Sequence, residues 1–366
     1  MKIDLKLLGM FALALVLCGC GQVNKYAAPK IAEGAVLALE FDQQQIDKIQ
    51  AAAFGEKGEA LTKKAWEEAP KEVAEIIKAA GLDNAKARWG AFSVGAPALE
   101  KDMELKEVPE VAAAIAVDID IEKVVATIRE QQQKDDDDDV QLVDTTVAGV
   151  KAWKVVDKDG ELAKAKAEPC FTALDGKLFL VASSLAALEK QVVLYRDGKG
   201  ASAAFAGFAL ADGDLLRLSV KDIGALIRKS VPKPEESLKL LAAFVPNGDK
   251  MILGLGTLDV TATAAADNGV TLKLLLGAAS EKDADQLRTL AKTSLIPLTL
   301  QLKKSAKKDA SVKRTLALVE GLKIAGPEGT FEADLAIPGD TLKAYAQEFV
   351  AKAEKDLAKK AKETKK

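Results

Sequence analysis

The chain has 366 residues, no histidine and a formal net charge of −3, and 5% of its residues are aromatic. Without histidine it lacks the Ser-His-Asp and Cys-His catalytic pairs, and three cysteines alone do not make a zinc site of Cys and His ligands. The nearly balanced charge gives no general attraction to nucleic acid. We therefore expect no cofactor, no bound metal and no nucleic-acid partner.

The N-terminus begins with a short apolar run. Lys2 and Lys6 provide positive charge, and residues 7–17 are apolar. Eleven residues are too few to cross a bilayer, which takes about 20. A short apolar run after positive charge is typical of a secretory signal peptide.

The run ends in Leu17, Cys18, Gly19 and Cys20, which resemble the lipobox of bacterial lipoproteins. The resemblance implies that Leu17, Cys18 and Gly19 are the recognised signal and that Cys20 is acylated and becomes the new N-terminus. It further implies several acyl chains, palmitate among them, which together make a stable membrane anchor. An uncleaved N-terminal anchor and secretion with an unmodified Cys20 are the alternatives.

The resemblance implies that the protein lies in the cell envelope, lipid-anchored and facing the periplasm or the cell surface. Gly21 follows the cysteine where an aspartate would favour the inner membrane, so we expect the outer membrane. Cleavage removes two lysines and one aspartate, and the formal charge moves from −3 to −4. The predicted organisation is a signal peptide (1–19), a linker from lipidated Cys20 (20–30), a first lobe (31–195), an inter-lobe linker (196–211), a second lobe (212–352) and a lysine-rich tail (353–366).

The first lobe repeats one pattern three times, in which an apolar strand leads into a capped helix. The predicted helix caps are Asp42, Asp120 and Ser184. After the first unit we expect a further helix over 61–80 and a strand over 87–95.

The second lobe shows the same series. Its predicted caps are Asp222, Ser280 with Asp283 in a capping box, and Asp340. A further helix is expected over 235–244, a strand over 250–262 and a lysine-rich helical segment over 299–320. Three units followed by three units indicate an internal duplication, against the alternative that common strand–helix patterns coincide.

Turn signals indicate antiparallel pairing. Asn268-Gly269 and Asp175-Gly176 each separate two apolar strands and favour a two-residue turn with positive φ. The sequence GPEG at 326–329 joins two further strands. The predicted fold class is α+β, with largely antiparallel sheets, helices on one face and two similar lobes. In pattern alone, the body resembles uncharacterised secreted and lipoprotein families of the bacterial envelope.

Three motifs suggest chemistry. Ser230 and Lys233 have the S-x-x-K spacing of penicillin-interacting enzymes, but Pro232 interrupts it and the companion motifs are absent. The acidic run Asp135–Asp139 lacks the spaced ligands of a calcium loop, so a solvated loop is favoured. Cys170 lies in an apolar run and is interpreted as a small buried hydrophobe. No catalytic or metal-ligating residue is therefore predicted.

Two function classes follow. The first is a non-catalytic envelope lipoprotein that binds a protein, a lipid or peptidoglycan, or has a structural role. The second is a carboxylate-dependent hydrolase acting on envelope glycans, which would need two carboxyl groups about 5–10 Å apart in a cleft. Paired buried carboxylates beside Trp66, Trp89 or Trp153 would favour the enzyme, and an apolar groove would favour lipid binding.

The lipobox yields a direct test. Replacing Cys20 with alanine removes the thiol at the position that is acylated in lipoproteins, so metabolic labelling with a palmitate analogue should be lost. A labelled band that persists in Cys20→Ala would contradict this interpretation of the leader.

Overall fold

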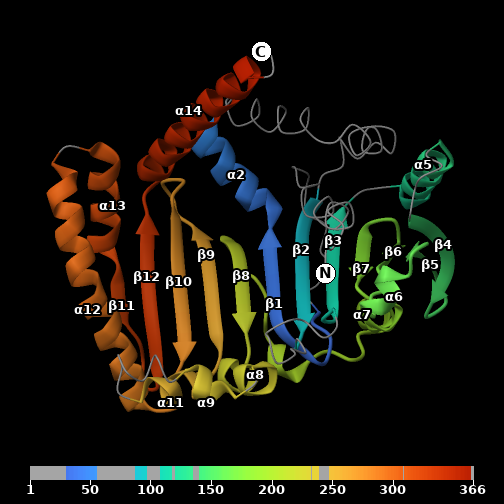
Figure 1. Cartoon of the computed structure of the whole chain (residues 1–366), viewed down its shortest axis with the longest axis horizontal. Coiled ribbons are helices and arrows are strands. Elements are labelled where there is room, and N and C mark those ends of the chain that lie inside the picture. The colour runs from blue at the N-terminus through green and yellow to red at the C-terminus, as the bar shows by residue number, and fades with distance from the viewer. Residues whose placement is uncertain are drawn as a thin grey trace. The chain divides into compact units, whose positions relative to one another are not determined.

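The computed structural model describes residues 30–55, 87–96, 108–117, 120–134, 140–231, 233–238, 247–307 and 309–363. These residues form two compact units. Unit 1 contains the strands before residue 210, and unit 2 contains those after it (Figure 1). Helix α2 (Gln43–Phe54) groups mostly with unit 2, and residues 226–236 group with unit 1.

Unit 1 is built on an antiparallel sheet in the order β1-β2-β3-β7-β6-β5-β4. Its strands are β1 (Ala35–Asp42), β2 (Ala87–Gly95), β3 (Val111–Val117), β4 (Val140–Val147), β5 (Val150–Asp157), β6 (Cys170–Leu174) and β7 (Leu178–Ala182). Its helices include α5 (Ile121–Lys134), α6 (Glu161–Lys164) and α7 (Leu185–Asp197), and residues 203–205 form a 3₁₀ turn.

Unit 2 has strands in the order β8-β9-β10-β12-β11, again antiparallel. They are β8 (Asp214–Val220), β9 (Leu258–Ala264), β10 (Val270–Gly277), β11 (Lys323–Ala325) and β12 (Thr330–Ile337). Helices α11 (Gly248–Leu253), α12 (Glu281–Ala306), α13 (Ala310–Gly321) and α14 (Gly339–Glu363) belong to this unit, whereas α8 (Ile223–Ser230) and the short α9 (Pro234–Ser237) lie wholly or partly in residues that group with unit 1. Among the described helices, none combines the length and the apolar content that crossing a bilayer requires.

The α+β class and the antiparallel sheets are confirmed. The two units also share one pairing order, which is β1-β2-β3-β7-β6 in unit 1 and β8-β9-β10-β12-β11 in unit 2. In both units the last of these five strands in the chain pairs with the third, and the fourth strand pairs with the last. Unit 1 adds the β4–β5 hairpin, whereas unit 2 has α13 at the corresponding point of the chain. This shared order is what an internal duplication requires, and the duplication itself remains an inference.

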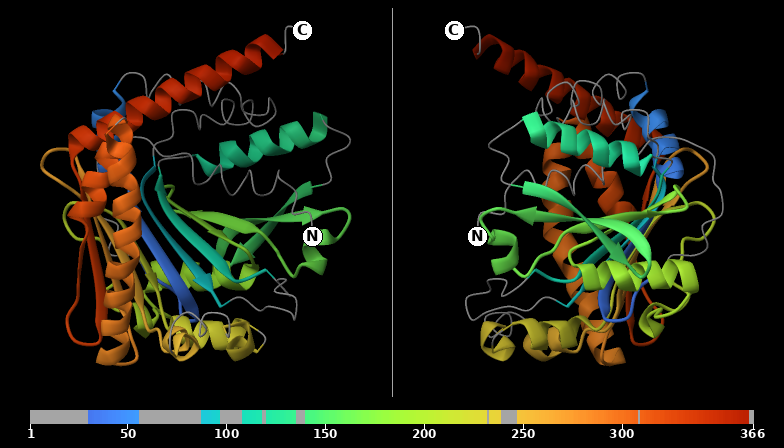
Figure 2. Two further views of the ribbon diagram at one scale, coloured as in Figure 1. Left: turned by 60° about the vertical axis from the view of Figure 1, so that its left-hand side comes forward. Right: turned by 90° about the vertical axis from the view of Figure 1, so that its right-hand side faces the viewer.

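The sheet of unit 1 is covered on both faces, which differs from the expected helices on one face. Side chains alternate along a strand, so Ala112 and Ala114 point to one face and Ala113 to the other. Ala112 and Ala114 pack with Leu188 of α7, and Ala113 packs in a cluster with Val125 of α5. Figure 2 shows α5 and α7 on opposite sides of these strands. Both faces are covered because the strand residues are apolar on both sides.

A third cluster lies in the segment predicted to link the lobes. Phe205 and Phe208 are buried against Ile31 and Ala38, with their rings edge to face and their centroids 5.8 Å apart. A carboxylate fixes the end of this segment to the sheet, because Glu40 accepts hydrogen bonds from Trp89 Nε1 and from the Leu210 amide, both at 2.7 Å.

The predicted caps are correct at three helices. Asp120 accepts a hydrogen bond from the Lys123 amide, Ser184 from the Ala187 amide and Ser280 from the Asp283 amide. The cap of α14 was predicted wrongly. Asp340 lies inside the first turn, and the Gly339 amide donates instead to Asp267, 72 residues earlier. Such a long-range cap leaves no local sequence signal.

The turns are longer than predicted. Residues 265–269 join β9 to β10, with φ of 60° at Asn268, and residues 175–177 join β6 to β7, with positive φ at Asp175 and Gly176. Residues 326–329 do join β11 to β12. The strand expected over 250–262 begins only at Leu258, because Lys250–Leu253 belong to α11. Residues 299–306 and 310–320 are helical as expected, in α12 and α13.

The Glu40 contact yields a stability prediction. Glutamine at this position would turn an amide N–H₂ toward one of two buried donors, so Glu40→Gln should lower the free energy of unfolding by about 1–3 kcal/mol. The matched control is Glu122→Gln, which breaks an exposed pair with Lys151 and should cost less than about 1 kcal/mol. Urea unfolding followed by tryptophan fluorescence measures both, and equal effects would contradict the proposed role of Glu40.

Candidate binding surfaces

Several residues singled out from the sequence lie outside the described residues. They are Leu17, Cys18, Gly19, Cys20, Trp66, Asp135–Asp139 and most of the helices expected over 61–80 and 235–244. Within the described residues, no group of three or more His, Cys, Asp or Glu side chains is placed to hold a metal ion.

The S-x-x-K pair is not on one helical turn. Helix α8 ends at Ser230, and Lys233 has a left-handed backbone with φ of 48° before α9 begins. The Lys233 ammonium pairs with Glu236 at 3.3 Å. The helical geometry that serine–lysine catalysis needs is therefore not formed here.

The tryptophans of unit 1 have structural environments. Trp89 donates to Glu40, a buried carboxylate whose two oxygens are used by Trp89 and Leu210. Trp153 is 2% exposed and stacks on Phe171, with ring centroids 5.6 Å apart. Trp153 therefore has no open face of the kind that stacks on a sugar, and the indole N–H of Trp89 is already bonded.

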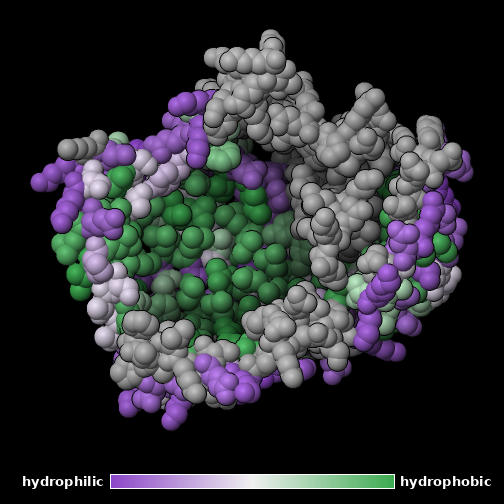
Figure 3. Space-filling view, in the orientation of Figure 1, coloured by the Kyte–Doolittle hydropathy of each residue, from purple (hydrophilic) through white to green (hydrophobic). Residues whose placement is uncertain are grey.

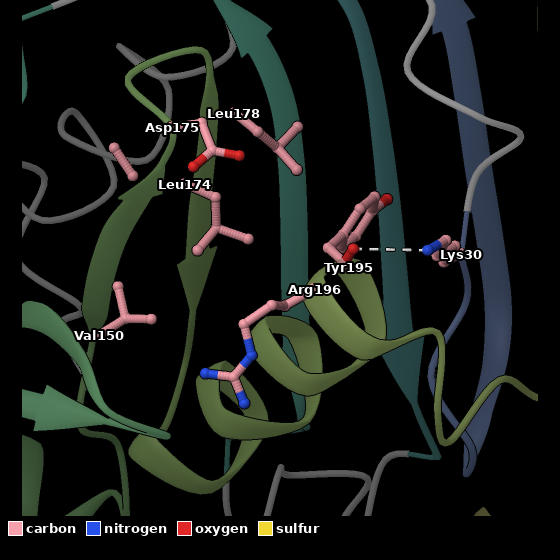
Figure 4. Close-up of a pocket in the computed structure, with 8 residues that line it drawn as sticks. Lys30, Val150, Leu174, Asp175, Leu178, Tyr195 and Arg196 are labelled. Atoms are coloured by element: carbon pink, nitrogen blue, oxygen red, sulfur yellow. Dashed lines mark hydrogen bonds between the residues drawn. The ribbon is translucent and has the colours of Figure 1, made fainter.

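The clearest hollow in unit 1 lies beside the end of α7 (Figure 4). It has a volume of about 420 Å³ and a largely aliphatic floor that includes Val150, Leu174 and Leu178. Its two cations already have partners. Lys30 Nζ donates to the carbonyl oxygens of Leu194 and Tyr195, at 3.2 and 3.4 Å, and Arg196 donates to the Ala148 carbonyl and pairs with Asp197.

The contacts of Lys30 bond carbonyl groups in the C-terminal turn of α7. Lysine and arginine near the last carbonyls of a helix favour its negative end. The two cations of the hollow are thus already bonded within the protein.

Unit 2 has a surface without charged groups, because one face of its sheet is entirely apolar. Paired residues of antiparallel strands share a face, and alternate residues of each strand belong to it. We call this the apolar face of unit 2. Its members in β8–β12 are Leu216, Leu218, Val220, Leu258, Val260, Ala262, Ala264, Val270, Leu272, Leu274, Leu276, Ile324, Phe331, Ala333, Leu335 and Ile337.

Among the described residues, no layer of side chains buries this face. All its members are partly exposed, and none is among the buried core residues. Figure 3 shows hydrophobic side chains gathered over these strands. The main contacts of helices α12 and α13 with this sheet are to β11 and β12, and among their described residues Ala284 alone is buried. Ile296 and Leu300 of α12 are 59% and 56% exposed.

The other face of the same strands is polar. Arg217, Asp259 and Glu332 lie on it, and Lys273 pairs with Glu332 at 3.0 Å. Leu275 is an apolar exception, opposite Asp259 and Glu332. One face is therefore suited to water, and the other has the composition of a hydrophobic core.

Unit 1 shows what such a face looks like when it is filled. One side of its sheet carries Phe171, Trp153 and Val181, all less than 10% exposed. Val125 of α5 completes that cluster. Helix α5 follows the third strand of unit 1, as α12 follows the third strand of unit 2. The two helices therefore occupy equivalent places in the chain and cover their sheets very differently.

Comparison with known proteins gives little further guidance. No family model matches the chain, and no curated protein matches it. Among solved structures, the chain is similar to "Structure of crystal form I of TP0453", with a TM-score of 0.38 and 10% sequence identity, covering 89% of this chain and 99% of that one. We draw no functional argument from a similarity at this level.

Sequence reasoning missed two features. The β4–β5 hairpin was not predicted, although VQLVDTTV and VKAWKVVD flank Ala148-Gly149, whose positive φ values of 48° and 79° suit a two-residue turn. The open face was also missed, because the apolar alternation of β8–β12 is the same whether a face is filled or exposed.

Cys170 provides a test of burial. It is 1% exposed and lies in the cluster under α7, and burial raises the pKa of its thiol to about 12. Below that pH the native thiol is protonated and inaccessible, so a maleimide at pH 8 should label it only after unfolding. Rapid labelling of the folded protein would show that this cluster opens.

Proposed function

We propose that this protein is an envelope lipoprotein, anchored through Cys20, that binds the acyl chains of lipids on the apolar face of unit 2. Its role is binding, without turnover of a substrate. The observation that carries the proposal is that a sheet face with the composition of a core has no protein layer over it within the described residues.

The size of the face supports a ligand larger than a small molecule. Strands of seven or eight residues are roughly 25 Å long, and four neighbouring strands are roughly 15 Å across. An apolar patch of several hundred Å² on a soluble surface usually marks an interaction site. Covering it would gain roughly 25 cal/mol for each Å² of apolar area removed from water.

The chemistry of the face favours acyl chains over a protein. Protein interfaces usually contain about one hydrogen bond for every 100–200 Å². No side chain of this face donates or accepts one, and the backbone groups of β9, β10 and β12 are paired within the sheet. A saturated chain needs no hydrogen bond, and each CH₂ group that it buries contributes about 0.8 kcal/mol.

The predicted acylation of Cys20 supports the same proposal independently of the sheet. An acylated Cys20 would hold the chain at a bilayer, where lipids are the abundant apolar molecules. The outer membrane, facing the periplasm or the cell surface, is the location that Gly21 favours. A protein or peptidoglycan partner would need polar contacts, which the polar face or the lysine-rich tail would have to supply.

The alternative, a hydrolase of envelope glycans, has no specific observation in its favour. Glu40 is a buried carboxylate beside a tryptophan, and its oxygens already accept from Trp89 and Leu210. A general acid or base needs an oxygen free to reach the substrate. Saturable turnover of a glycan, lost on replacing one acidic residue, would instead establish this alternative.

Two adjacent leucines test the proposal. Leu274 lies on the apolar face, between Val260 and Ala333, whereas Leu275 points to the polar face. Leu274→Lys would place a charge among the acyl chains and should weaken binding of a fluorescent fatty acid at least about tenfold, which corresponds to 1.4 kcal/mol. Leu275→Lys places the same charge beside Asp259 and Glu332 and should change the affinity little.

The measurement is a fluorescence titration of the purified chain from residue 21, with circular dichroism to show that both variants fold. Equal losses in the two variants, or no binding by the unsubstituted protein, would contradict acyl binding at this face.

A further inference from the structure

Strand β4 forms one edge of the sheet of unit 1. It pairs with β5 over eight consecutive residue pairs without a bulge, and no strand of the described residues pairs with its other side. Natural proteins usually guard such an edge with lysine, proline, a bulge or a very short strand. Strand β4 has eight residues, and its sequence VQLVDTTV contains neither lysine nor proline.

Among the described residues, side chains bond backbone carbonyls at the two ends of this edge, and Arg129 of α5 pairs with the Asp144 carboxylate near its middle, at 2.9 Å. Gln132 Nε2 donates to the Val140 carbonyl at 2.9 Å, and Arg196 Nη1 donates to the Ala148 carbonyl at 2.6 Å. Residues 141–147 between them form a regular strand, and Gln141, Val143 and Thr146 are exposed. The edge is therefore regular and long enough to accept another strand.

The side chains beside the edge are also apolar. Val143 is 39% exposed, and Val156 of β5 is 38% exposed. Gln141 pairs with Val156, so Val143 and Val156 are diagonal neighbours on one face. An exposed apolar pair beside an open edge is the combination that favours strand addition.

We propose that β4 pairs antiparallel with β4 of a second copy of this chain, with Val143 opposite Val143. In this twofold register Gln141 faces Thr145, and Leu142 faces Asp144. The neighbouring register would set Asp144 opposite Asp144, which repels. The strand is thus complementary to itself in a register that joins the two exposed valines and separates the two acids.

The expected association is weak. Pairing of two edge strands buries less than the roughly 1,000 Å² of a stable interface. Anchoring both copies in one membrane would raise their effective concentration and favour the pair. The proposal concerns unit 1 and does not depend on what unit 2 binds.

Cysteine cross-linking of the full chain in its membrane tests the register. In Val143→Cys the two cysteines would lie opposite each other, within the Cα separation of 4.4–6.8 Å that a disulfide spans. In the control Thr145→Cys they would be four residues out of register, about 13 Å apart. Mild oxidation should give at least about tenfold more disulfide-linked dimer for Val143→Cys than for Thr145→Cys.

A mixture of Gln141→Cys and Thr145→Cys chains should cross-link between the two variants, because these positions face each other. Absence of a dimer in Val143→Cys, or equal dimer at Thr145, would overturn the proposal. Cross-linking of Val143→Cys to a different protein would overturn the identity of the partner. Buried Cys170 provides the internal check, since its modification would reveal unfolding.

Discussion

The structure depends on the need to cover the apolar side chains that alternate along antiparallel strands. Unit 1 meets this need on both faces, with α7 over one side of the sheet and α5 beside the other. In unit 2 the polar face suits water, and the apolar face remains partly exposed. The contrast between the two units is what directs attention to a ligand, because a face with the composition of a core gains free energy only when something covers it.

Polar contacts fasten the helices of unit 2 to the sheet and to one another. Arg288 of α12 pairs with Glu281 and Asp285 and donates to the Thr330 carbonyl, and Glu281 also accepts from the Gly329 amide. Arg314 of α13 pairs with Glu348 of α14, and Thr315 shares a hydrogen bond with Tyr345. Two backbone amides, first Gly339 and then Gly269, hold the pKa of Asp267 below its usual range. These contacts position the helices without filling the sheet, which is why the unit can keep an open face.

Much of the local structure could be predicted because its causes are local. Apolar alternation identified the strands β1, β3, β7, β8, β10 and β12, and Asp120, Ser184 and Ser280 cap helices in the way their hydroxyl and carboxylate oxygens allow. The α+β class followed from turn residues that favour positive φ. The cap of α14 could not be predicted, since Asp267 reaches it only after β10 to β12 are assembled.

The sequence by itself determined the class of the fold, the order of strands and capped helices, and the resemblance of the leader to a lipobox at Cys20. Only the tertiary structure decided that α5 and α7 pack on the apolar strand residues of unit 1, while the residues of the apolar face of unit 2 remain partly exposed. It also decided that no described strand pairs with the outer edge of β4, whose two ends bond to side chains. Alternation specifies which side of a strand is apolar, whereas the layer that covers that side comes from distant segments whose placement depends on the assembled chain.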